Sequence, residues 1–254
     1  MSERVRHASG LTSLLSIVGG LALWEAASRL LVDNSLFLAA PSQIVVAIWK
    51  LAMSGLLWKH VQVSAIEFFL GYVIASILGI AMGLAMAESE RAKRIFQPWI
   101  SGLYATPTIA LGPLFLLWFG IGIWSKVLVV ITLVIFSVVI NTEAGLRNTS
   151  ERLIEMLRSF GATRQQIFWK LSLPSAAPFI LAGLKLGIGR GLIGVVVAEL
   201  FGSRAGLGQL ISQSADSFNM PNLFAAVVVL ASAGIAMTAG FTWLEKSLVP
   251  WTKD

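Results

Sequence analysis

The chain has 254 residues, of which 56% are hydrophobic and 13% are charged, and its mean hydropathy is +0.81. A water-soluble domain needs a polar shell that this composition does not supply, so the composition indicates an integral membrane protein. The absence of cysteine excludes disulfides and thiolate metal sites, and the formal charge of +6 is spread over short loops, which argues against nucleic-acid binding.

Six runs of residues are apolar and long enough to cross a bilayer as helices, since a span takes about 20 residues. They lack the alternation of a β-barrel, so we expect an all-α polytopic membrane protein with about six transmembrane helices. The predicted spans are residues 11–32, 64–87, 96–119, 127–146, 176–201 and 223–244.

The first run is preceded by basic residues, as the apolar core of a cleaved signal peptide would be. Its length, its internal Glu25 and Arg29, and the five spans behind it favour a retained helix. Residues 41–62 follow it with apolar side chains at helical spacing. They predict a short helix that lies on the membrane surface or covers the bundle.

The lysines and arginines between the spans give the orientation, because short cytoplasmic loops are enriched in them. With a cytoplasmic N-terminus, twelve fall on the inside and four on the outside, so we expect both termini in the cytoplasm. The inside set is Arg4, Arg6, Arg91, Lys93, Arg94, Arg147, Arg152, Arg158, Arg164, Lys170, Lys246 and Lys253, and the outside set is Lys50, Lys59, Lys126 and Arg204.

Glycines recur at intervals of four residues on two of the predicted spans. Gly79 and Gly83 lie on the second span, and Gly183, Gly187 and Gly191 lie on the fifth. Such strips of small residues let another helix approach closely. The strips could serve helix packing within one subunit or a contact between subunits, and their spacing is compatible with both.

Polar groups and prolines inside the spans indicate where a solute could pass. Pro107 and Pro113 interrupt the third span, which could line a path or only kink. Arg190 falls near mid-bilayer, where a guanidinium must face a cavity or bind a neighbouring helix, whereas Lys185 could snorkel to the inner surface. Glu199 lies nine residues beyond Arg190, on the opposite side of the helix. The candidate path residues are Thr106, Thr108, Ser137, Asn141, Thr142, Lys185, Arg190 and Glu199.

Two kinds of chemistry are missing from the sequence. The chain has no Gly-x-x-x-x-Gly-Lys-Ser/Thr loop, so any ATP must be hydrolysed by another chain. His7 and His60 are the only histidines and are far apart in the sequence, which argues against a histidine metal site and an intramembrane serine protease. We therefore expect a protein that is not itself an enzyme and holds no metal.

The segment 150–170, between the fourth and fifth spans, is polar with apolar residues at helical spacing. It predicts an amphipathic helix that begins at Ser150 and stops at Gly161, and a second short helix ended by Leu173 and Pro174. Such a hairpin could lie on the lipid surface or dock in a groove of a soluble partner. Periodicity alone does not choose between them.

The residue types in this segment favour docking on a soluble partner over binding to the lipid surface. Glu155, Gly161, Leu171, Leu173 and Pro174 have the spacing of the cytoplasmic signature loop of inner-membrane permeases in binding-protein-dependent ABC importers, which the chain resembles. Met156 and Leu157 stand where that loop usually has alanines. The resemblance implies an ATPase-coupling site formed by Glu155, Met156, Leu157, Phe160, Gly161, Leu171, Leu173 and Pro174.

The resemblance covers about residues 64–251. Segments 117–122, 125–126, 141–142, 189–190, 197–199 and 206–208 look like the branch that handles taurine, alkanesulfonates, nitrate and related compounds. It implies a type I ABC importer permease fold, in which residues 1–63 form a transmembrane helix and a periplasmic segment. Residues 64–254 would be a permease core with five spans and the coupling loop 147–175.

The resemblance also implies partners in the bacterial inner membrane. They are a second permease copy, by default identical, two ATPase subunits that carry ATP and Mg, and a periplasmic or lipid-anchored binding protein. This chain would hold no cofactor itself.

The sequence is compatible with several functions. A path containing Arg190 suits a small anion such as a sulfonate, taurine or nitrate. The same branch also includes permeases for pyrimidine vitamin precursors and other heterocycles. A channel or ion-coupled carrier without an ATPase, or a structural scaffold, fits the spans but leaves the hairpin around Gly161 without a purpose.

Overall fold

The computed structural model describes residues 2–30 and 37–250, and every regular element within these ranges is helical. Four helices are long and apolar enough to cross a membrane, and a fifth span results if one bent pair of helices is counted as one. The four are α3 (Leu56–Glu88), α6 (Ile123–Arg147), the continuous helix Arg164–Phe201 and α11 (Met220–Leu248). The all-α polytopic fold predicted from the sequence is confirmed.

The predicted first span falls on α1 (Ser2–Leu30), while its last two residues lie outside the described part of the chain. Its role as a span therefore stays a prediction. The short helix expected after it is α2 (Pro41–Met53), with Pro41 in the first turn, where its missing N–H costs nothing. The buried face of α2 packs over the ends of other helices, so α2 covers the bundle.

The third predicted span is not straight. It consists of α4 (Glu90–Ala105), followed after a break by η1 (Thr108–Leu111) and α5 (Gly112–Phe119), and the two parts are bent by 88°. The break lies at Thr106 and Pro107, where Thr106 is extended and Pro107 has no N–H to donate. Pro113 does not break the helix, because it lies in the first turn of α5.

The fifth predicted span begins much earlier than expected. Residues Arg164–Phe201 form one helix of 38 residues made of α8 (Arg164–Ile167), the π-helical segment η2 (Phe168–Ser172) and α9 (Leu173–Phe201). The prediction that Leu173 and Pro174 end a separate short helix is therefore wrong. The Leu173 N–H bonds to Phe168 O, five residues back, and this wider turn accommodates the proline that follows.

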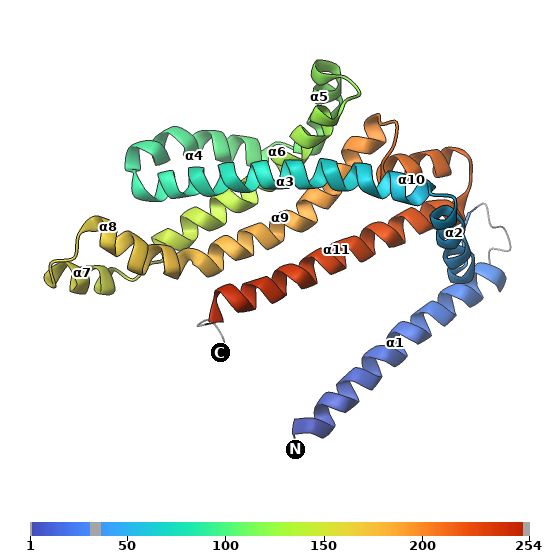
Figure 1. Ribbon diagram of the computed structural model, residues 1–254, viewed down its shortest axis with the longest axis horizontal. Helices are drawn as coiled ribbons and strands as arrows, with labels where there is room; N and C mark the ends of the chain where they lie inside the picture. The colour runs from blue at the N-terminus through green and yellow to red at the C-terminus, as the bar shows by residue number, and fades with distance from the viewer. Residues whose placement is uncertain (1, 31–36, 251–254) are drawn as a thin grey trace.

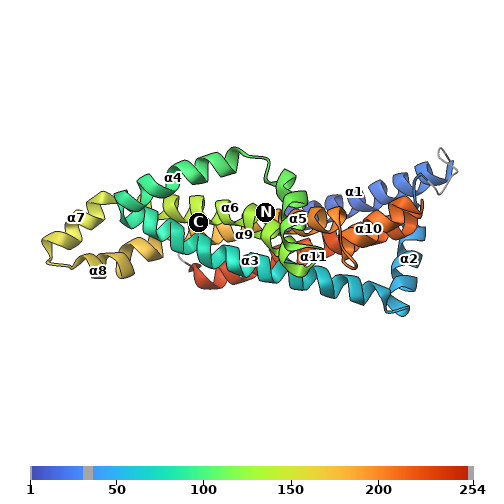
Figure 2. The same ribbon diagram turned by 90° about the horizontal axis from the view of Figure 1, so that it is seen from above.

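The core is a layer of three helices, with α6 between α3 and α9. They run together along the length of the molecule, with α7 (Glu151–Ser159) and α8 at one end and α2 and α10 (Leu207–Asp216) at the other (Figures 1 and 2). We call these the hairpin end and the α10 end. Helix α1 contacts α2 and extends away from the core layer (Figure 1).

The glycine strips lie inside this layer. A Cβ added at Gly79 or Gly83 of α3 would lie 2.8 Å from Val138 Cβ or 2.6 Å from Thr142 Cβ of α6. On α9, a Cβ at Gly183 would lie 2.8 Å from Asn141 Cβ of α6. These glycines therefore serve close packing within one subunit, which was one of the two functions that their spacing allowed.

Candidate functional site

The hairpin between α6 and α9 is built by two turn signals. Gly161 follows α7 with a φ of +80°, a left-handed conformation that ends the helix and that glycine adopts without strain. Thr163 then begins α8: its hydroxyl accepts the Gln166 N–H at 3.3 Å, and Gln166 Oε1 accepts the Thr163 N–H at 2.8 Å. Ser150 occupies the predicted N-cap position of α7 but makes no side-chain cap bond.

The first helix of the hairpin presents apolar side chains to the outside. No residue of α7 is buried, Met156 is 48% exposed and Phe160, just after the helix, is 81% exposed. Glu155, which precedes Met156, is also exposed, and Leu157 is half-buried. An exposed amphipathic helix with a protruding aromatic ring is suited to a groove in another protein.

The second half of the hairpin is tied to the membrane helices. Leu171, Leu173 and Pro174 are half-buried within the helix that continues to Phe201. Arg164 Nη2 donates to both the carboxylate and the backbone carbonyl of Glu88, each at 2.8 Å, which joins α8 to the end of α3. The hairpin is therefore joined both to α3 and to α9.

Ion pairs also join α4 to α6 at the hairpin end. Lys93 Nζ lies 2.9 Å from Glu143 Oε1, and Arg147 bonds Glu90 at 2.9 Å and Glu143 at 3.0 Å. These contacts hold the first turns of α4, whereas its last turn precedes the break at Thr106.

Arg190 lies beside that break. Its Nη2 donates to Tyr104 Oη at 3.2 Å, and its guanidinium carbon is 5.4 Å from the centre of the Tyr104 ring, a cation–π contact. Tyr104 is in the last turn of α4 and packs edge-on against Phe136 of α6. The side chain of Thr106 bonds only to the Gly102 carbonyl at 2.9 Å and is exposed, while Thr108 is buried.

The structure separates most other candidate path residues from Arg190. Asn141 Nδ2 donates to Ser137 O at 2.7 Å, and both residues line the close contact of α6 with Gly183. Thr142 faces α3 instead. Lys185 does not snorkel freely, because its Nζ lies 3.3 Å from Glu245 Oε2 of α11.

Glu199 lies apart from all of these residues, buried at the α10 end. Ser64 Oγ donates to its Oε1 at 2.6 Å and the Gly208 N–H to its Oε2 at 2.5 Å. Two further buried ionisable side chains interact with it, Glu67 and Lys126. Across residues 2–30 and 37–250, no group of three or more His, Asp or Glu side chains could hold a metal ion.

This cluster is not predicted from the sequence, although one feature of the sequence points to it. Glu67 lies inside a predicted span, where an ionisable residue calls for a partner. The sequence predicts a loop position for Lys126, just before a span, but the residue is only 2% exposed in the first turn of α6.

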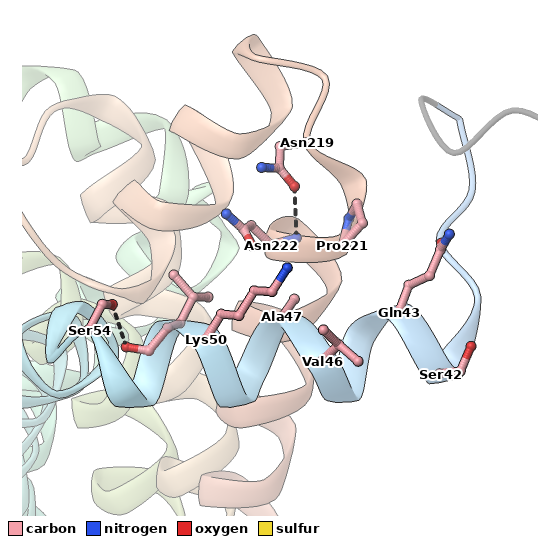
Figure 3. A pocket seen from close by; sticks show the side chains of 10 residues that line it. Ser42, Gln43, Val46, Ala47, Lys50, Ser54, Asn219, Pro221 and Asn222 are labelled. Carbon is pink, nitrogen blue, oxygen red and sulfur yellow. Dashed lines mark hydrogen bonds between the residues drawn. The ribbon is translucent and has the colours of Figure 1, made fainter.

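The largest cavity among those described lies at the α10 end, between α2 and the start of α11. It measures about 700 Å³ and is lined by Gln43, Lys50 and Asn222 among others. The Lys50 side chain extends over it toward Asn222, and Asn219 accepts the Asn222 N–H at 3.2 Å (Figure 3). Amide and ammonium groups of this kind could bind an anionic group presented from outside the chain.

Comparison with known proteins agrees with this geometry. The profile of the family described as binding-protein-dependent transport system inner membrane component matches residues 75–254. The formylaminopyrimidine transport permease protein ThiX of Halalkalibacterium halodurans is 34% identical over 92% of each chain. The putative aliphatic sulfonates transport permease protein SsuC of Bacillus subtilis is 33% identical over 91% of this chain and 84% of its own.

A third relative, the taurine transport system permease protein TauC of Escherichia coli, is 31% identical over 99% of this chain and 91% of its own. A solved structure of the MetNI methionine ABC transporter in an inward facing conformation has a TM-score of 0.67 and 19% identity, and covers 78% of this chain and 98% of that chain. The chain therefore belongs to the family of binding-protein-dependent transport system inner membrane components and is a permease subunit of an ABC importer.

Proposed function

We propose that this permease conducts a small solute with an anionic group, such as a sulfonate, taurine or nitrate, along the exposed face of α9. Arg190 carries this proposal. It lies eleven residues before the end of α9, which is about 16 Å at 1.5 Å per residue and about half of a hydrocarbon core of 30 Å. Leu186, Gly189 and Ile193 around it on the same face are exposed.

Exposing a guanidinium to lipid at this depth costs too much free energy. The stripe of α9 formed by Leu186, Gly189, Arg190 and Ile193 must therefore face water or protein. A second copy of the permease, related by a two-fold axis, would enclose the stripe and leave a path between the copies. The break that follows α4, beside Tyr104, would form part of the wall of that path. The relatives whose names mention sulfonates and taurine support the choice of an anion.

The ATPase subunits, in this proposal, dock on the α7–α8 hairpin. Each permease copy then takes one ATPase, the hairpin end is cytoplasmic, and the binding protein arrives at the α10 end. ATP must favour the outward-open state and the loaded binding protein must bind that state better, so that the two are coupled. The continuous helix Arg164–Phe201 supports this, since it links the hairpin directly to Arg190.

The test is uptake by the full complex, co-purified with its ATPase and binding protein and reconstituted in liposomes. A panel of sulfonates, nitrate and uncharged pyrimidines is offered to the wild type, to Arg190→Gln and Arg190→Lys, and to Lys246→Gln, a control that removes an exposed charge in the last turn of α11. We expect uptake of an anion, a loss of at least about tenfold in Arg190→Gln, a smaller loss in Arg190→Lys and none in Lys246→Gln.

Preferred uptake of a neutral pyrimidine, or unchanged uptake by an assembled Arg190→Gln complex, would contradict the anion path. Transport by the permease alone without ATP would contradict the ATPase partnership.

A further inference from the structure

Five polar side chains from three core helices are enclosed together at the α10 end. His60, Ser64 and Glu67 of α3 are 5%, 5% and 3% exposed, Lys126 of α6 is 2% exposed, and Glu199 of α9 is 0% exposed. Nothing in the proposed transport path uses them. Buried charges on this scale persist only when they are paired and hydrogen-bonded.

The hydrogen bonds of the cluster converge on Glu199. The Ser64 hydroxyl accepts the Leu207 N–H at 2.8 Å, so its own proton is available for Glu199 Oε1 at 2.6 Å. The other oxygen of Glu199 accepts the Gly208 N–H. Both oxygens of Glu199 thus act as acceptors, which is the pattern of an ionised carboxylate.

Glu67 has the opposite environment. Its carboxyl group interacts with that of Glu199, and its Oε2 has no hydrogen-bond partner in the described structure. Two interacting buried carboxyl groups are best accommodated with one proton between them, and the donors already directed at both oxygens of Glu199 favour the proton on Glu67. The ammonium of Lys126 attracts both groups and balances the one remaining negative charge.

The close fit of the turn before α10 depends on this carboxylate. Gly206 has a φ of +130°, and a Cβ at this residue would overlap the carboxyl group of Glu199. His60 Nδ1 contacts the same glycine, 2.7 Å from its carbonyl oxygen and 3.0 Å from its nitrogen. The turn and the start of α10 are therefore held by α3 and α9 through Glu199, Ser64 and His60.

We propose that Glu199 is a positioning residue for binding-protein docking: through its bonds to Ser64 and the Gly208 N–H, it fixes α10 to the core helices. This rests on the proposed arrival of the binding protein at the α10 end. A load on α10 is then passed to α3, α6 and α9 instead of being absorbed by a loose turn.

The two glutamates give a matched pair of variants. In Glu67→Gln the amide N–H₂ replaces the carboxyl proton as donor to Glu199, so the cluster is preserved. In Glu199→Gln one of the two acceptor oxygens becomes an amide donor, so either the Ser64 hydroxyl proton or the Gly208 N–H loses its acceptor, and Lys126 loses its anion. The variants are compared in the reconstituted complex by the ATPase rate with and without loaded binding protein.

We expect Glu67→Gln to keep the stimulated rate within about twofold of the wild type, and Glu199→Gln to lose most of the stimulation, about tenfold or more, while its basal rate stays. Equal effects of the two variants, or full stimulation of Glu199→Gln, would overturn the proposal. Stimulation is read whatever solute the binding protein carries, so an error about the anion path would leave this result unchanged.

A milder variant covers the case in which Glu199→Gln does not assemble. Ser64→Ala removes one donor to Glu199 and the acceptor of the Leu207 N–H. Amide hydrogen exchange should then rise about tenfold or more in residues 202–210 and stay unchanged in the α7–α8 hairpin. Unchanged exchange in residues 202–210 would contradict the positioning role.

Discussion

Adding one methyl group at Gly83 should separate α3 from α6. The added Cβ would lie 2.6 Å from Thr142 Cβ, 2.8 Å from Thr142 Cγ2 and 2.9 Å from the carbonyl oxygen of Val139. Non-bonded carbon atoms prefer about 3.5 to 4.0 Å, so the overlap is about 1 Å. The backbone oxygen cannot be relieved by a side-chain rotation, and the helices themselves must move.

Gly83→Ala should therefore cost stability despite the better helix propensity of alanine. Overpacking of this kind costs about 1 to 3 kcal/mol, and alanine in place of glycine returns about 1 kcal/mol where there is room. Gly240→Ala in α11 is the matched control, because nothing lies within 4 Å of its added Cβ. The free energies of unfolding of the two variants should differ by about 1 to 3 kcal/mol, since both gain the same helix propensity.

Thermal unfolding in detergent measures this difference, at about 2 to 4 °C for each kcal/mol in a chain of this size. The oligomeric mass is measured beside it. Gly83→Ala should unfold at a lower temperature than Gly240→Ala without losing a partner copy. Equal unfolding temperatures would refute the internal packing of the strip, and intact stability with a lost partner would place the strip between subunits.

Two further outcomes follow from polar contacts between helices. Lys185→Met should lower the free energy of unfolding by about 1 kcal/mol, because it leaves Glu245 unpaired. Adding Glu245→Gln should recover most of that loss, as measured by thermal unfolding. A double variant less stable than Lys185→Met would contradict the ion pair. Tyr104→Phe keeps the ring beside the Arg190 guanidinium and removes only the 3.2 Å hydrogen bond. The initial rate of solute uptake should therefore fall less in Tyr104→Phe than in Tyr104→Ala. Equal losses in the two variants would contradict a role for the ring contact.

The sequence predicted the helices better than their contacts. Hydrophobic length located α3, α6 and α11, and the glycine at position 161 located the turn of the hairpin, because both signals are local. The spacing of Gly79 and Gly83 identified a close contact but not its partner, since a strip of small residues carries no information about which helix packs there.

Other features depended on geometry that no local pattern contains. Pro107 could produce a kink or a break, and only the tertiary structure gives the bend of 88°. Pro174 predicts a helix end, yet a wider π turn allows the helix to continue past it.

The buried acidic pair was beyond local patterns for a different reason. Glu67 and Glu199 are 132 residues apart in the sequence, and they meet only because α3 and α9 lie in the same layer. The sequence did indicate that Glu199 and Arg190 face different sides of their helix, and they do contact different neighbours.

The docking of the ATPase on the hairpin is tested most directly by co-purification from detergent. Phe160→Ala removes the side chain that is 81% exposed beside Glu155, and Gly161→Leu strains the turn at a φ of +80°. Phe37→Ala is the control, because it removes an equally large side chain, 71% exposed, far from the hairpin. We predict that the ATPase stays with the wild type and with Phe37→Ala and is lost from folded Phe160→Ala and Gly161→Leu, whereas equal retention by all four would contradict the coupling role of the hairpin.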